Sequence, residues 1–248
     1  MLNKTILFSL IFIFSIIGLV IIYFYYESKN AYEDPRVFEA RKLLSEYDKL
    51  INNKDYNLGF ALLQKLEEIY LQYPSYSESY EIGIIYNNFA SANLMLAIYE
   101  QKSEEEKSEY LQKAHDFALK SIAIYVKWLK TYGEVAKNDI YNLIKGDFQP
   151  NDEAFKGKDI EKFRNKRIEE IEIAQVETYR RLSVSYTNLG MIQRHLLRHN
   201  DAIKSYSTAL DLWEDNHTAK NNLRVLVGEE PIKRSIVDKL FPKDRKTK

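Results

Sequence analysis

The phrase that decides the fold is Tyr-Thr-Asn-Leu-Gly at residues 186–190. A related phrase, Lys-Asn-Asn-Leu-Arg, occupies residues 220–224, so that Gly190 and Arg224 are 34 residues apart. A sequence that repeats itself with a period of roughly 20 to 50 residues is typical of solenoids, in which each unit buries its apolar face against its neighbours. The phrase therefore predicts stacked repeat units, an architecture that makes binding surfaces rather than active sites.

The residues around this phrase have the spacing of a helical hairpin. Tyr186 lies three residues before Leu189, which Gly190 follows. The next expected helix carries small and aromatic residues at Ala202, Tyr206 and Ala209. Small residues let two helices approach closely, and aromatic rings fill the remaining gap between them. With this spacing, residues 183–216 resemble one unit of the tetratricopeptide repeat (TPR) family.

Two positions depart from the family pattern, and other stretches resemble it more weakly. Gln193 and Glu214 stand where the family commonly has Tyr and Pro. Residues 217–228 resemble the first helix of a further repeat, which would cap the stack. Residues 86–90 read Tyr-Asn-Asn-Phe-Ala, and a degenerate third unit covers residues 54–74. The expected packing partner of residues 86–90 is the helix that carries Ala114, Ala118 and Ser121.

The resemblance implies an all-α fold with a TPR-like α-helical solenoid, and we expect an N-terminal transmembrane helix to precede it. We expect degenerate TPR-like hairpins over 27–132, an irregular insertion over 133–158, a long helix with the repeat and its capping helix over 159–228, and a C-terminal tail over 229–248. Eight Gly and five Pro in 248 residues fit long helices. Ser75 and Glu78 predict a capping box for a helix reaching about Gln101, and Ser103 predicts the next helix start.

The N-terminus predicts a membrane anchor. After a tail of residues 1–5, residues 6–26 contain no charged side chain, and a helix of that length spans about 30 Å, enough to cross a bilayer. The alternative is a cleaved signal peptide, which needs small residues at a cleavage site, whereas this segment ends in aromatic residues. Lys4 favours a cytoplasmic N-terminus, while Lys29 and Arg36 argue for the opposite orientation. We expect a single-pass protein of the bacterial inner membrane with a periplasmic domain.

Composition and motifs argue against several function classes. The chain has 36 Lys plus Arg and 36 Asp plus Glu, so its formal net charge is zero. A nucleic-acid-binding protein would carry an excess of basic residues, and the composition therefore argues against that class. The absence of Cys excludes disulfides, thiol catalysis and Cys-based zinc sites. His195 and His199 have the i, i+4 spacing of a zinc motif, but Leu196 stands where a metalloprotease needs Glu. We therefore expect no enzyme activity, no metal and no cofactor, and we interpret the acidic and basic residues of 167–181 as an exposed, ion-paired helix face.

The resemblance also implies a concave groove lined by the first helix of each repeat. In the middle unit the matching positions are Ile84, Asn87, Ser91 and Leu94. In the repeat at residues 183–216 they are Val184, Thr187, Met191 and Arg194. In the expected capping helix at residues 217–228 they are Thr218, Asn221 and Val225. Asn88, Asn188 and Asn222 share one equivalent position, which we interpret as part of the repeat pattern. A mixed polar and aliphatic lining suits a helix or an extended segment of another protein.

The function that this resemblance implies is that of a membrane-anchored scaffold or adaptor. It would mediate protein–protein interactions during assembly of an envelope complex, such as a flagellar motor or a secretion machine. One alternative is a periplasmic chaperone-like binder of exported proteins. Two others are a metal-dependent enzyme that happens to be helical and a self-assembling homo-oligomer.

Overall fold

The computed structural model describes residues 12–23, 32–100 and 103–233. Within these ranges the chain is all-α and has no strand, which confirms the predicted fold class at that level. Residues 12–23 are helical. The further helices are α2 (Phe38–Asn52), α3 (Tyr56–Leu71), α4 (Pro74–Ser77), α5 (Tyr80–Tyr99), α6 (Glu104–Tyr132), α7 (Lys137–Ile144), α8 (Ile160–His195), α9 (His199–Leu212) and α10 (His217–Leu226), with short 3₁₀ turns η1 (Lys145–Asp147) and η2 (Glu153–Phe155).

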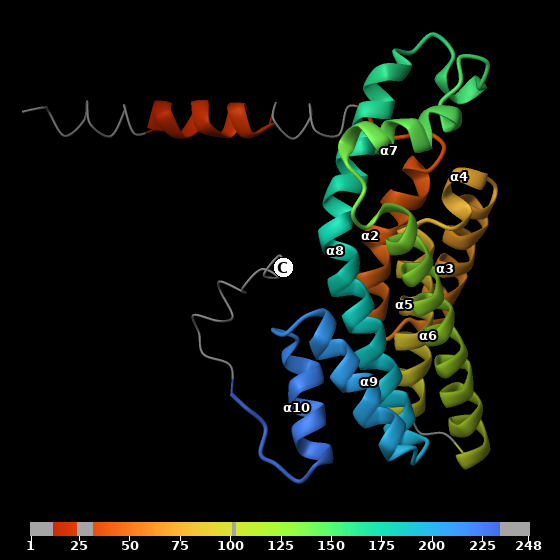
Figure 1. Cartoon of the computed structure of the whole chain (residues 1–248), viewed down its shortest axis with the longest axis vertical. Helices are drawn as coiled ribbons and strands as arrows, with labels where there is room; N and C mark the ends of the chain where they lie inside the picture. Colours follow the sequence, from red (N-terminus) through yellow and green to blue (C-terminus); the bar gives the residue numbers. More distant parts are fainter. Residues whose placement is uncertain (1–11, 24–31, 101–102, 234–248) are drawn as a thin grey trace, which may run out of the picture.

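The long helices form hairpins that stack on one another (Figure 1). The hairpins are α2 with α3, α5 with α6, and α8 with α9, and α10 follows the last of them. The second helix of each hairpin packs on the first helix of the next, so that α3 meets α5, α6 meets α8 and α9 meets α10. First helices also touch in sequence, α5 with α8 and α8 with α10. Contacts between neighbouring units are the pattern that helical repeats need in order to bury their apolar faces.

One of the two predicted helix starts is confirmed by the structure, and the other is wrong. The Ser103 hydroxyl accepts from the Glu106 amide, and the Glu106 carboxylate accepts from the Ser103 amide, so α6 begins at the predicted residue, with a capping box. The prediction at Ser75 is wrong, because α4 ends at Ser77 and α5 starts only at Tyr80. Tyr76 of α4 is buried and donates to the Asp34 carboxylate at 3.0 Å, which holds this short helix apart from α5, where one continuous helix was expected.

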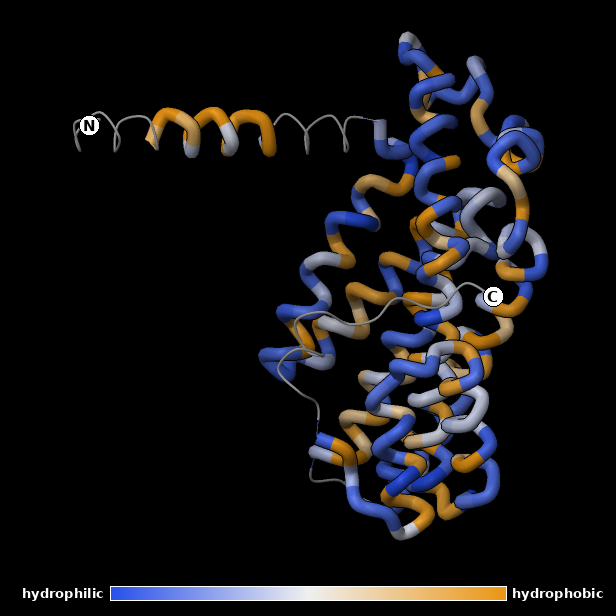
Figure 2. The backbone as a smooth tube through the Cα atoms, turned by 60° about the vertical axis from the view of Figure 1, so that its left-hand side comes forward, coloured by the Kyte–Doolittle hydropathy of each residue, from blue (hydrophilic) through white to orange (hydrophobic). Residues whose placement is uncertain are grey.

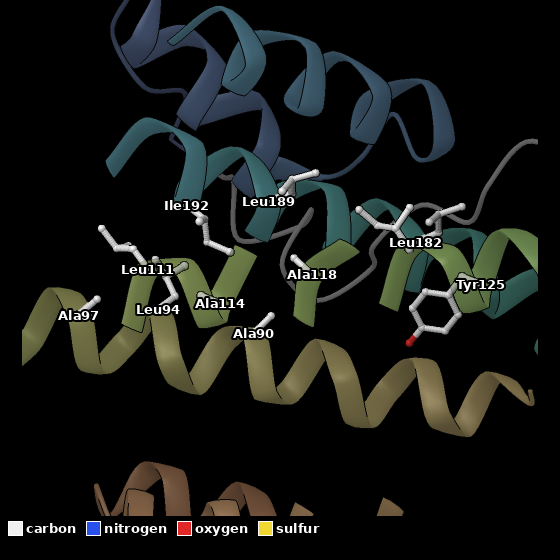
Figure 3. Packing of buried hydrophobic residues seen from close by; sticks show 11 residues of the cluster. Ala90, Leu94, Ala97, Leu111, Ala114, Ala118, Tyr125, Leu182, Leu189 and Ile192 are labelled. Carbon is white, nitrogen blue, oxygen red and sulfur yellow. The ribbon is translucent and has the colours of Figure 1, made fainter. Parts of the chain in front are cut away.

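The central core lies between α5, α6 and α8 (Figure 3). Ala90, Ala114 and Ala118 are fully buried there, so the predicted packing partner of residues 86–90 is confirmed. A second cluster joins α2 and α3 to α5. A third fills the space between α6, the insertion and the N-terminal half of α8, and its members include Trp128, Ile140, Phe148, Phe155, Phe163 and Ile171. The insertion thus supports the part of α8 that extends beyond the last repeat.

Two glycines set the closest helix approaches. A Cβ atom added to Gly190 of α8 would lie 2.6 Å from the Tyr206 ring of α9. A Cβ atom added to Gly83 of α5 would lie 2.5 Å from the Tyr125 ring of α6, a side chain that Figure 3 shows extending from α6 towards α5. The sequence echo aligned Ala90, and not Gly83, with Gly190. The structure places the equivalent glycine–tyrosine contact two helical turns earlier, at Gly83, where 42 residues separate the glycine from Tyr125, against 16 between Gly190 and Tyr206.

The predicted anchor at 6–26 lies partly outside the described residues, at 6–11 and 24–26. Helical residues 12–23 are strongly hydrophobic (Figure 2), and Phe12, Phe14 and Leu19 are each about two-thirds exposed. Across 12–23, 32–100 and 103–233, none of the helices combines the length and the apolar character needed to cross a membrane.

Replacing Gly190 with Ala should destabilise the fold. Alanine favours helices over glycine by up to about 1 kcal/mol, but overpacking against the Tyr206 ring costs about 1–3 kcal/mol, so we expect a net loss in the free energy of unfolding. Urea denaturation followed by circular dichroism measures it. Gly146→Ala is the control, because an added Cβ there meets no atom within 4 Å. A Gly190→Ala protein as stable as wild type would contradict the close contact, and Tyr206→Ala in the same chain should relieve part of the loss.

Candidate functional site

The predicted groove residues of α5 face the neighbouring helices rather than an open surface. Leu94 is buried in the central cluster, and Ile84 packs against the same cluster. Ser91 is half-buried. The Asn87 Oδ1 atom accepts hydrogen bonds from the Ser185 hydroxyl and from the Asn188 amide of α8, both at 3.0 Å. In this hairpin the predicted lining therefore serves mainly to join α5 to α8.

Some of the predicted groove residues of α8 are buried against neighbouring helices, and others are exposed to solvent. Thr187 is buried, donates to the Ser183 carbonyl at 2.8 Å and accepts from the Asn216 amide at 2.9 Å. Met191 packs against two apolar clusters, and Arg194 is half-buried. Val184 is exposed to 38 %. Leu94 and Thr187 thus do not line an open surface, whereas Val184 does.

The three residues predicted on the capping helix lie together on one face. Thr218, Asn221 and Val225 of α10 line a shallow hollow of about 370 Å³, to which His217, Asn222 and Ile232 also contribute. Val225 is 48 % exposed, and the Asn221 side chain binds the backbone of Ile232. Of the predicted groove, the α10 face is the part that forms a hollow.

The three Asn residues at the repeated position have different roles. Asn188 donates to Asn87, while Asn222 donates to the Thr218 carbonyl within its own helix at 2.9 Å. At Asn88 it is the main-chain carbonyl that is used, since it accepts the Tyr47 hydroxyl of α2 at 3.1 Å. The bonds at Asn88 and Asn188 join two helices, whereas the bond of Asn222 lies within α10.

A buried network of charges connects α2, α5 and α8. Arg167 of α8 donates to the Glu81 carboxylate of α5 at 2.6 Å and to Glu170 at 3.2 Å. Glu170 also accepts a bidentate pair of hydrogen bonds from Arg41 of α2, at 2.6 and 2.7 Å. The Arg167 guanidinium lies over the Tyr76 ring at 4.5 Å. Glu81 and Arg167 are nearly inaccessible to solvent, as are Arg36 and Asp34, which form a second buried ion pair.

Sequence reasoning missed this network because it placed Arg167 and Glu170 on an exposed helix face. The exposed interpretation is correct for Glu177 and Arg180, which form a partly exposed ion pair at 3.1 Å. The periodicity of apolar residues along the helix could have shown that Arg167 faces inward. Arg167 stands four residues after Phe163 and four before Ile171, both of them buried core residues, so it lies on the inward face of α8.

The pKa values of the network follow from burial and pairing. Burial alone would raise the pKa of Glu81, but Arg167 and then Arg41 outweigh it and hold the pKa below its ordinary value. Burial likewise opposes the charged form of Arg41, yet its hydrogen bonds to Glu170 raise its pKa. Arg41, Arg167 and Glu81 thus remain charged at neutral pH, and their hydrogen bonds link them directly or through Glu170. Such an arrangement fixes the positions of helices, and it leaves no group poised to transfer a proton.

A cavity of about 310 Å³ lies beside this network. Its wall includes Ser79, Trp128, Tyr132, Asp147 and Arg167. Burial raises the pKa of Asp147, although Arg36 and Arg167 act in the opposite direction. The Arg167 guanidinium that borders the cavity is already bonded to two carboxylates. The wall of the cavity is therefore aromatic and mixed polar, and it includes the Asp147 carboxyl group.

The two histidines with zinc-like spacing do not share a helix. α8 ends at His195 and α9 begins at His199, and between them Leu197 has a φ of +58°. This turn destroys the i, i+4 geometry that a helical metal site requires. Burial, followed by Arg194 and Lys107, lowers the pKa of His195. No cluster of three or more potential metal-ligating side chains occurs in the part of the chain that the structure describes.

Comparison with known proteins adds no family assignment. No protein family, curated protein or solved structure matches this chain. The TPR resemblance therefore rests on the repeated phrase and on the packing of the hairpins.

Breaking the buried ion pair should cost more than removing an exposed one. Glu81→Gln leaves Arg167 with Glu170 as its remaining carboxylate partner, and loss of one member of a buried pair typically costs about 3–5 kcal/mol. We expect about 3 kcal/mol, measured by urea denaturation. In the double variant Glu81→Met with Arg167→Met, much of that loss should be recovered, because no buried charge is left unpaired. Glu39→Gln, which removes the exposed pair with Lys65, should cost less than about 1 kcal/mol.

The same pair predicts how stability depends on pH. Because the folded-state pKa of Glu81 is lowered, its contribution is present above the ordinary Glu pKa of about 4.3 and is lost as the pH falls through the folded value. Acid titration of the free energy of unfolding between about pH 6 and pH 3 should therefore show a steeper decline in wild type than in Glu81→Gln. Parallel curves for the two proteins would mean that Glu81 does not titrate differently in the folded and unfolded states.

Proposed function

We propose that this chain is a membrane-anchored, TPR-like scaffold that binds other proteins within an envelope assembly. The observation that carries the proposal is the stack of helical hairpins in which each unit packs on the next, with the same glycine–tyrosine contact in two of them. Stacks of this kind expose long helix faces, and proteins use such faces to bind helices or extended segments.

The site chemistry supports binding rather than catalysis. The strongly desolvated charges of the described residues are paired with one another, and the hollow on α10 is lined by hydroxyl, amide, imidazole and aliphatic groups. Such groups recognise a polypeptide through its backbone and its apolar side chains. Neither feature provides an activated nucleophile or a general acid–base pair.

The hydrophobic N-terminus supports a location at the bacterial inner membrane. In this proposal residues 6–26 cross the bilayer and the hairpins lie on the periplasmic side. Anchoring confines the binding faces to the membrane surface and raises their effective concentration towards other membrane-bound proteins. That arrangement suits an adaptor in a large envelope machine, of which a flagellar motor and a secretion system are examples.

The test is site-specific photo-crosslinking of the full-length protein in its native membrane. A photoreactive amino acid replaces Val184, which is 38 % exposed on the face of α8 predicted to bind. The control places it at Leu119 of α6, which is 45 % exposed and lies outside the predicted groove. We expect one dominant envelope protein to be crosslinked at Val184 and not at Leu119.

Two other results would change the conclusion. A broad range of unfolded exported proteins crosslinked at Val184 would instead support the chaperone-like alternative. Equal products at both positions would show that the predicted face has no special role, and the scaffold proposal would fail at that surface.

A further inference from the structure

The chain's own C-terminal segment lies along α10. At the end of this helix Gly228 has a φ of +84°, a left-handed conformation that glycine adopts at little cost. The Gly228 amide donates to the Val225 carbonyl at 3.2 Å and the Glu229 amide to the Arg224 carbonyl at 2.7 Å, the two bonds of a Schellman motif. This turn sends residues 229–233 back beside α10 (Figure 1).

Asn221 holds that returning segment by its backbone. Its Nδ2 atom donates to the Ile232 carbonyl at 3.1 Å, and its Oδ1 atom accepts from the Ile232 amide at 2.8 Å. One amide side chain thus satisfies both main-chain groups of a single extended residue. Bonds of this kind recognise an extended backbone whatever side chain it carries, and Pro231 keeps the preceding residue extended.

Arg224 and the hollow supply the selectivity that Asn221 lacks. The Arg224 Nε atom donates to the Glu230 carbonyl at 2.7 Å, and its guanidinium pairs with the Glu229 carboxylate, also at 2.7 Å. The Ile232 side chain contributes to the hollow that Thr218 and Val225 line. Ile232 nevertheless remains 38 % exposed and Val225 48 % exposed, so the segment covers this face incompletely.

We propose that the face of α10 is a binding site for an extended segment of a partner protein, and that residues 229–233 occupy it as an intramolecular competitor. The partner segment carries an acidic residue that meets Arg224 and, three residues later, an aliphatic residue whose backbone meets Asn221. The inference rests on the proposed function, because it assigns the chemistry of a protein partner to one face of the stack.

Competition within the chain sets the affinity of this site. A short flexible tether gives a tethered ligand an effective concentration in the millimolar range, so a free segment of equal intrinsic affinity binds weakly while the site is occupied. A partner displaces residues 229–233 when it binds more tightly or when it is itself concentrated at the membrane. The device therefore suppresses binding by stray peptides and admits a partner within an assembly.

The test uses full-length protein in detergent micelles and a fluorescent peptide with the sequence of residues 228–237. Ile232→Asp in the protein should release the tethered segment, because a charge replaces the apolar side chain in the hollow. We expect this variant to bind the peptide at least tenfold more tightly than wild type, as measured by fluorescence anisotropy. Adding Asn221→Ala to the same chain should abolish the gain.

Two controls separate the site from a general change in charge or folding. Val227→Asp makes the same substitution at an aliphatic residue that is 52 % exposed and outside the hollow, so it should leave peptide binding at the wild-type level. A peptide with Asp at the position of Ile232 should bind none of the proteins. Trypsin cleavage after Lys233 should be faster in Ile232→Asp than in wild type, which reports release of the segment directly.

Three results would overturn the inference. Unchanged cleavage would show that Ile232 does not hold the segment, and unchanged peptide affinity despite faster cleavage would show that the vacated face binds nothing. A wild-type dimer that becomes monomeric with Ile232→Asp, detected by light scattering, would place the segment on a second copy instead. Each of these is distinct from failure of the scaffold proposal, which the crosslink from Val184 on α8 tests independently.

Discussion

The close approach of paired helices is the constraint on which the rest of this structure depends. At Gly83 and at Gly190 a hydrogen atom faces the ring of a tyrosine on the partner helix, and no methyl group fits in its place. The two contacts, with Tyr125 and Tyr206, fix how α5 lies on α6 and how α8 lies on α9. Once each pair is fixed, its outer faces are fixed as well, and α8 has one position in which it packs on both α6 and α9.

The buried charges act on the same arrangement in a different way. An apolar core tolerates small shifts of one helix along another, whereas Arg41 binds Glu170 bidentately in one register only. Arg167 and Glu81 impose the same condition between α8 and α5. Well-packed apolar residues of similar volume often stabilise a protein as well as a buried ion pair does. Our hypothesis is therefore that this network contributes mainly to the choice of register, and the double replacement with Met separates that contribution from stability.

Local features of the fold could be predicted from the sequence, and long-range ones could not. The helix start at Ser103 and the hairpin of residues 183–216 depend on residues close to one another in the chain, and both are found in the structure. The partner of Arg167 is 86 residues away, so its sequence neighbours suggested an exposed face instead. The alignment of Ala90 with Gly190 missed the contact at Gly83, because the glycine and its tyrosine are 42 residues apart in the α5–α6 hairpin and only 16 apart in the α8–α9 hairpin. For the candidate site, the face of α10 was predictable because its residues come from one helix, while the burial of Leu94 depended on how α8 crosses it.

The length of α8 has a mechanical consequence. Its 36 residues extend about 54 Å and join the aromatic cluster of the insertion at one end to the last hairpin at the other. The described helix contains no proline, the residue that most commonly kinks a helix, and side chains pack against it along much of its length. We therefore expect α8 to behave as a rigid helix. A force applied to the insertion is then transmitted along α8 to α9 and α10, and the two ends of the molecule move together as one rigid body.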